Sequence, residues 1–126
     1  MALSIGLVLA TFRVGLTIRR ARTRKRPPPR GARARHLRLA RPALLLLMLG
    51  AVGGPLSSLV LRGWTPLGTL HGFLGGACAL LFFVTWRLGR RLEAGEFGAR
   101  EAHARFGALG VLGAAVAAIA GFVLLP

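Results

Sequence analysis

One stretch of the sequence, residues 19–41, constrains the fold of this 126-residue chain more than any other. It reads RRARTRKRPPPRGARARHLRLAR, carries eleven of the eighteen basic residues and includes three consecutive prolines, but it holds no acidic residue. Such a segment is too costly to place in a bilayer and too polar to form a packed core. It therefore lies outside any membrane and fixes the side on which the neighbouring segments begin.

Strongly apolar segments flank this stretch. Hydrophobic residues make up 54% of the chain, and the mean hydropathy is +0.61. This is more apolar than an ordinary small soluble domain. The single cysteine, Cys78, lies inside an apolar run, so the chain offers neither an intramolecular disulfide nor a cysteine-based metal cluster. The composition indicates a membrane protein.

The apolar segments predict an all-α membrane protein, a four-transmembrane-helix up-down bundle that forms one membrane domain over residues 1–126. A helix needs about 20 residues to cross a bilayer, and the first segment is shorter and contains Arg13. Near a helix end, an arginine can extend its head group to the interface. The predicted spans are 2–18, 42–61, 67–86 and 106–125, joined by a basic loop at 19–41, an outer turn at 62–66 and a second loop at 87–105.

The charges of the loops predict the topology. The 19–41 and 87–105 loops hold eleven and five basic residues, whereas the 62–66 turn holds one. The positive-inside rule then places both loops in the cytoplasm and both termini outside. We expect a multi-pass protein of the bacterial inner (plasma) membrane, with anionic lipid at the 19–41 loop. Nucleic acid is not an expected partner, because that loop has no aromatic residue on which bases could stack.

The three histidines are the candidate functional residues. His36 and His103 stand at the cytoplasmic entrances of the second and fourth predicted spans, and His71 stands near the outer face. Two neutral imidazoles can supply the axial ligands of haem b, in which case His36 and His103 bind the iron. In the competing interpretation, these are amphipathic residues in the head-group layer.

Residues around the histidines are further candidate parts of a haem site. Arg38 and Arg105 are candidate partners for haem propionates. Small residues stand one and two turns inward from each histidine, which would help to admit a flat macrocycle. They are Ala40, Ala43, Gly75, Cys78, Gly107 and Gly110.

Two short matches suggest that the four predicted helices are two related hairpins. The pattern H-x-R recurs at 36–38 and 103–105, with an offset of 67 residues. Arg13-Val14-Gly15 recurs as Arg87-Leu88-Gly89, with an offset of 74. The two offsets differ, so a duplication requires an insertion or deletion. Basic clusters at the cytoplasmic ends of helices would produce similar matches without duplication.

Three motifs carry a family resemblance: Arg35-His36, Leu70-His71-Gly72 and Arg100-Glu101-Ala102-His103. With them, the chain resembles an uncharacterised four-span bacterial and cyanobacterial family related to the cytochrome b561 group. The resemblance implies that His36 and His103 hold one haem on the cytoplasmic side. It also implies a partner for His71 near the outer end of the first span, where residues 1–5 have no histidine. Either that site was lost or the true start lies upstream, so at most one bis-histidine haem is expected.

The resemblance implies electron transfer rather than substrate turnover. We therefore expect an electron carrier with an unidentified redox partner, and not an enzyme. The alternative is a cofactor-free structural or accessory four-span membrane protein. A homo-oligomer is compatible with either function.

Overall fold

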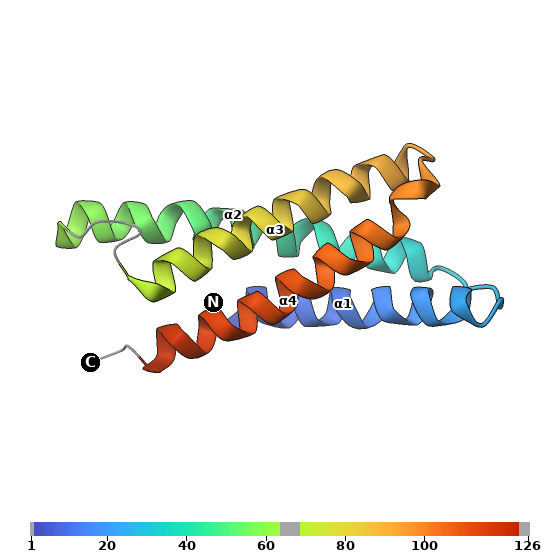
Figure 1. Cartoon of the computed structure of the whole chain (residues 1–126), viewed down its shortest axis with the longest axis horizontal. Coiled ribbons are helices and arrows are strands. Elements are labelled where there is room, and N and C mark those ends of the chain that lie inside the picture. The colour runs from blue at the N-terminus through green and yellow to red at the C-terminus, as the bar shows by residue number, and fades with distance from the viewer. Residues whose placement is uncertain (1, 64–68, 124–126) are drawn as a thin grey trace. The chain divides into compact units, whose positions relative to one another are not determined.

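The computed structural model describes residues 2–63 and 69–123, and all regular structure in these ranges is helical (Figure 1). The elements are α1 (Ala2–Thr23), α2 (Ala32–Arg62), α3 (Leu70–Glu93), the short 3₁₀ helix η1 (Phe97–Ala99) and α4 (Arg100–Val123). The prediction of an all-α protein is confirmed. The predicted outer turn at 62–66 falls mostly on residues 64–68, which lie outside the described residues.

The chain divides into two compact units, Met1–Leu47 and Met48–Pro126. The first contains α1 and the N-terminal half of α2, which form a helical hairpin. The second contains the rest of α2 and the hairpin of α3 and α4, which η1 joins at one end (Figure 1).

The prediction of a four-span bundle with both termini outside is wrong. In the part of the chain that the structure describes, three helical stretches are long and apolar enough to cross a membrane: Ala32–Leu61, Leu70–Glu93 and Phe97–Val123. α1 is not among them. The longest uncharged stretch of α1 runs from residue 2 to residue 12, because Arg13 follows, and covers only about 16 Å at 1.5 Å per residue. A bilayer core is about 30 Å thick.

The basic segment is more helical than we predicted. α1 continues through Arg19 to Thr23, and α2 begins at Ala32, so only residues 24–31 link the two helices. α2 then runs through Pro42, the first residue of the predicted second span, and through Pro55. As a result, His36 lies within a helix. The predicted 87–105 loop is likewise mostly helical, since α3 extends to Glu93 and α4 starts at Arg100.

α1 and α3 end in the same way. The residue Lys25 has a positive φ of 52°, and Arg26 N–H donates to the Ala21 carbonyl oxygen at 2.9 Å. After α3, Gly95 has a φ of 93°, and Glu96 N–H donates to the Arg91 carbonyl oxygen at 2.9 Å. These are Schellman motifs, in which a left-handed residue ends the helix and satisfies its last carbonyls. In each hairpin, the first helix therefore ends at a defined residue, Lys25 after α1 and Gly95 after α3.

Most of the buried side chains are small, although Phe82 is also buried, and many large apolar side chains face outward. The buried residues include Val8, Ala43, Ala99 and Ala117, whereas Leu61 and Phe122 are 79% and 78% exposed. A water-soluble protein would do the reverse. Membrane helices pack through small residues and leave large apolar side chains to lipid. With the three long apolar helices, this arrangement indicates a membrane protein.

Candidate functional site: the histidine contacts

His71, in the first turn of α3, contacts the backbone of α4. Its ring nitrogen Nδ1 lies 2.8 Å from the carbonyl oxygen of Ala117, within hydrogen-bonding distance. The ring also lies against Gly121, where an added Cβ would stand 2.6 Å from Nδ1. Real Cβ atoms do not approach another heavy atom so closely, so a glycine at this position is required for the contact.

His103, in the first turn of α4, makes the reciprocal contact with α3. Its Nδ1 lies 2.9 Å from the carbonyl oxygen of Thr85. A Cβ added at Gly89 would stand 3.3 Å from the His103 Cε1. Each helix of this hairpin thus offers one imidazole to its neighbour and receives one from it. The two contacts lie toward opposite ends of the hairpin.

His36 makes the same contact within the first unit. Its Nδ1 lies 3.2 Å from the carbonyl oxygen of Thr11 on α1. A Cβ added at Gly15 would stand 3.4 Å from the His36 Cε1. All three histidines of the chain therefore use one geometry, in which Nδ1 bonds a helix carbonyl and the ring lies on a glycine four residues further along that helix.

Helix geometry explains why the glycine follows four residues after the carbonyl. In an α-helix, the carbonyl of residue i points along the axis toward the N–H of residue i+4. An imidazole that approaches this oxygen from the side must pass over residue i+4. A side chain at that position would block the approach, so glycine allows the carbonyl to accept a second hydrogen bond.

The spacing along each helix places donor and acceptor on one face. His71 precedes Thr85 by 14 residues and Gly89 by 18, and His103 precedes Ala117 and Gly121 by the same intervals. Eighteen residues make about five turns at 3.6 residues per turn, so the histidine and the glycine point in the same direction. One face of α3 and one face of α4 therefore carry both halves of the reciprocal contact.

The two hairpins repeat the same sequence as well as the same contact. Thr11-Phe12-Arg13-Val14-Gly15 corresponds to Thr85-Trp86-Arg87-Leu88-Gly89. The segment Gly31–Arg38 corresponds to Gly98–Arg105, in which the two glycines, alanines, histidines and both pairs of arginines are identical. The paired alanines, Ala32 and Ala99, are each 9% exposed. The chain therefore contains an internal duplication, which our predicted repeat indicated only in part.

The difference between the two sequence offsets has a structural cause. From glycine to histidine, the first hairpin has 21 residues and the second has 14. The seven additional residues extend α1 beyond Gly15 and lengthen the link that contains the three prolines. The duplicated contact is thus kept while the turn between the helices differs.

The same spacing identifies a fourth acceptor position, on α2. Gly50 and Gly54 follow His36 by 14 and 18 residues, as Ala117 and Gly121 follow His103. A Cβ at Gly50 or Gly54 would meet no atom of the described residues within 4 Å.

Hydrogen bonding assigns the protonation of the three rings. A carbonyl oxygen can only accept, so Nδ1 of each imidazole donates and carries the proton. In the neutral ring the lone pair then belongs to Nε2, the nitrogen that would bind a metal. Metal-ligating histidines commonly donate their other ring N–H to a backbone carbonyl in this way. Within the described residues, no group of three or more His, Cys, Asp or Glu side chains could hold a metal ion.

The other predicted site features are less favourable to a cofactor. His36 and His103 lie in different units of the structure, each within its own hairpin. Arg38 and Arg105 are exposed and follow their histidines by two residues, which is about 200° around a helix. Each arginine therefore lies on a different face from the histidine that it was expected to assist.

The small residues near the histidines mostly serve helix packing. A Cβ at Gly110 would meet the Phe82 ring at 3.2 Å, and one at Gly107 would meet the Thr85 methyl at 3.5 Å. On α4, the glycines that we assigned to a macrocycle therefore lie against the α3 side chains Phe82 and Thr85. Sequence reasoning found the three histidines but missed Thr11, Thr85 and Ala117, because any residue type can supply a carbonyl.

Comparisons with protein-family models, curated proteins and solved structures found no match. The resemblance to a family related to the cytochrome b561 group therefore stays a prediction.

Proposed function

We propose that the protein is a membrane electron carrier of the bacterial inner membrane, in which His36 and His103 serve as axial ligands of haem b. Haem would supply one-electron chemistry, which the side chains of this chain do not provide by themselves. The redox partner is unidentified. In this proposal the protein transfers electrons and does not convert a substrate.

One observation supports this proposal. Nδ1 of His36 and Nδ1 of His103 contact equivalent backbone carbonyls, those of Thr11 and Thr85, in two copies of one hairpin. The bond fixes the ring orientation and places the lone pair on Nε2, which is the arrangement that an axial imidazole needs. The duplication therefore supplies two matched imidazoles, the number that a bis-histidine haem requires.

The residues around each histidine would orient the ligand. Gly15 and Gly89 let the imidazole approach the partner helix, and the carbonyl accepts the Nδ1 proton. Arg38 and Arg105 lie on different helix faces from their histidines and therefore have no role in the proposed binding of haem.

Absorption spectroscopy of the purified chain tests the proposal. We expect a Soret band after expression with haem supply, and loss of that band in His36→Ala and in His103→Ala. His71→Ala is the matched control, since His71 makes the same contact but is not one of the two proposed ligands. A protein without a Soret band, or one whose band survives both substitutions, would contradict the proposal.

Methionine substitution separates ligation from folding. Methionine is an alternative axial ligand and raises the reduction potential relative to histidine. His103→Met should therefore keep bound haem with a shifted spectrum and a higher potential. If His103 only stabilises the hairpin, the spectrum of any bound haem will not change.

A second candidate function is that of a cofactor-free structural or accessory membrane protein. The observation that favours it is the contact of His71, whose Nδ1 bonds Ala117 at 2.8 Å in the same geometry. Here the imidazole joins two helices, which needs no cofactor. Two results would support this function. The protein purified without haem should unfold cooperatively, and each of the three His→Ala variants should have a lower free energy of unfolding.

A further inference from the structure

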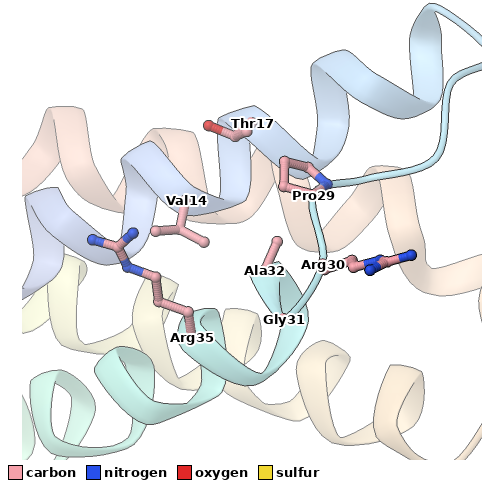
Figure 2. Close-up of a pocket in the computed structure, with 7 residues that line it drawn as sticks. All are labelled: Val14, Thr17, Pro29, Arg30, Gly31, Ala32 and Arg35. Atoms are coloured by element: carbon pink, nitrogen blue, oxygen red, sulfur yellow. The ribbon is translucent and has the colours of Figure 1, made fainter.

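A groove lies along the first hairpin between α1 and the start of α2. Its volume is about 480 Å³. It is lined by Gly6, Leu9, Ala10, Arg13, Val14, Thr17, Arg35 and Leu39. A smaller hollow of about 180 Å³ shares Val14, Thr17 and Arg35 with the groove and extends it to Pro29 and Ala32 (Figure 2).

Two arginines, one from each helix, line this groove. Arg13 comes from α1 and Arg35 from α2. Figure 2 shows Arg35 reaching from α2 toward α1 beside Val14, whereas Arg30 points away from the hollow. The unit Met1–Leu47 has twelve basic residues and no acidic residue in its sequence, so it contains no carboxylate that could neutralise the pair. Two guanidinium groups on one groove favour an anion with several oxygen acceptors.

The groove changes from polar to apolar along its length. Thr17 lies near the link between the helices, whereas Gly6 lies about 16 Å further along α1, at 1.5 Å per residue. The lining around Gly6 is apolar and includes Leu9 and Leu39. A free phosphate would use only the arginine end. A phospholipid fits both ends, because a negatively charged head group is joined to an acyl chain.

We propose that this groove binds one anionic phospholipid, with its phosphate at Arg13 and Arg35 and an acyl chain along Leu9 and Leu39. The proposal concerns a defined site on the first hairpin and does not depend on the haem proposal. It also differs from general attraction of lipid to the basic 19–41 segment, because most of the charges of that segment lie outside the groove.

The duplication supports a site on the first hairpin alone. The counterpart of Arg13 is Arg87, but the counterpart of Arg35 is Ala102. The second hairpin therefore keeps one arginine of the pair and lacks the other.

Lipid co-purification tests the proposal. The full chain in detergent is incubated with equal amounts of phosphatidylglycerol and phosphatidylcholine that have the same acyl chains, and bound lipid is counted by mass spectrometry. We expect selective retention of phosphatidylglycerol.

Two double variants test the arginine pair. Arg13→Gln with Arg35→Gln should reduce that retention by about fivefold for each arginine. Arg24→Gln with Arg26→Gln removes the same charge outside the groove and should leave retention unchanged. Equal loss in both pairs, or no loss in either, would overturn the proposal.

A third variant tests the acyl chain. A Cβ at Gly6 would meet no atom of the described residues within 4 Å, so Gly6→Leu adds an apolar side chain at this end of the groove without a change of charge. It should lower retention of phosphatidylglycerol but leave binding of glycerol 3-phosphate unchanged. Retention that is unchanged in Gly6→Leu would mean that the site binds phosphate alone and would overturn the lipid proposal. This variant decides the outcome if the double arginine variant fails to fold.

Discussion

The imidazole of His71 and the backbone of Gly121 lie closer together than any side chain at residue 121 would allow. A Cβ there would stand 2.6 Å from Nδ1 and 2.8 Å from Cε1 of the ring. The same ring bonds the Ala117 carbonyl oxygen at 2.8 Å, so it cannot turn away without losing that bond. The glycine and the hydrogen bond are therefore a single structural feature.

Substitution of this glycine should destabilise the hairpin of α3 and α4. We expect Gly121→Ala to lower the free energy of unfolding by about 1–3 kcal/mol, the usual cost of overpacking. Gly89→Ala should cost less, because its Cβ would stand 3.3 Å from His103, and Gly15→Ala should cost least, at 3.4 Å from His36. Unfolding of the purified variants in detergent, followed by circular dichroism, measures this order.

The matched control is Gly54→Ala. Gly54 corresponds to Gly121 in the duplication, but its Cβ would meet no atom of the described residues within 4 Å. Because alanine favours helix over glycine by about 1 kcal/mol, this variant should be neutral or slightly more stable. Equal losses at residues 54 and 121 would show that the histidine contact does not decide the requirement for glycine.

A double-mutant cycle should show that His103 and Gly89 act together. The hydrogen bond of His103 to Thr85 should contribute about 0.6 kcal/mol, the average for side-chain hydrogen bonds within membranes, so His103→Ala should cost at least this much. Gly89→Ala should be destabilising in the native chain but neutral or stabilising in the His103→Ala background. Unfolding free energies of the four proteins give the coupling. Additive effects would mean that the ring does not lie against residue 89 in the folded protein.

The sequence was sufficient to predict an all-helical membrane protein and to single out the three histidines as candidate functional residues. Long apolar runs, and the ionisable residues beside them, can be read directly from the order of residues. The acceptors of the histidines could not be predicted, since a backbone carbonyl carries no residue identity. A search for glycines 18 residues after each histidine would have found Gly54, Gly89 and Gly121. The predicted number of spans was wrong because an arginine near the middle of a short apolar helix was treated as an end residue.

The pair Phe82 and Gly110 should behave as one packing unit. Phe82 is buried on α3, and a Cβ at Gly110 would meet its ring at 3.2 Å. Gly110→Ala should therefore cost about 1–3 kcal/mol through overpacking. Phe82→Leu replaces the ring with a smaller branched side chain and should recover some of this loss when combined with Gly110→Ala. The measurement is again the unfolding free energy in detergent. A double variant no more stable than Gly110→Ala would mean that the ring does not limit the size of residue 110.

Membrane topology provides the last prediction. α1 is not among the helical stretches of the described residues that are long and apolar enough to cross a membrane, so we expect the N-terminus to stay on the same side as residues 24–31, which the positive-inside rule places in the cytoplasm. α2 and α3 should each cross, which returns the exposed residue Glu96 to that side. In a Cys78→Ala background, Arg26→Cys, Glu96→Cys and a cysteine in an N-terminal tag should react with a membrane-impermeant maleimide only in inside-out vesicles. A tag that reacts from the outside while Arg26→Cys reacts from the inside would show that α1 crosses the membrane despite Arg13.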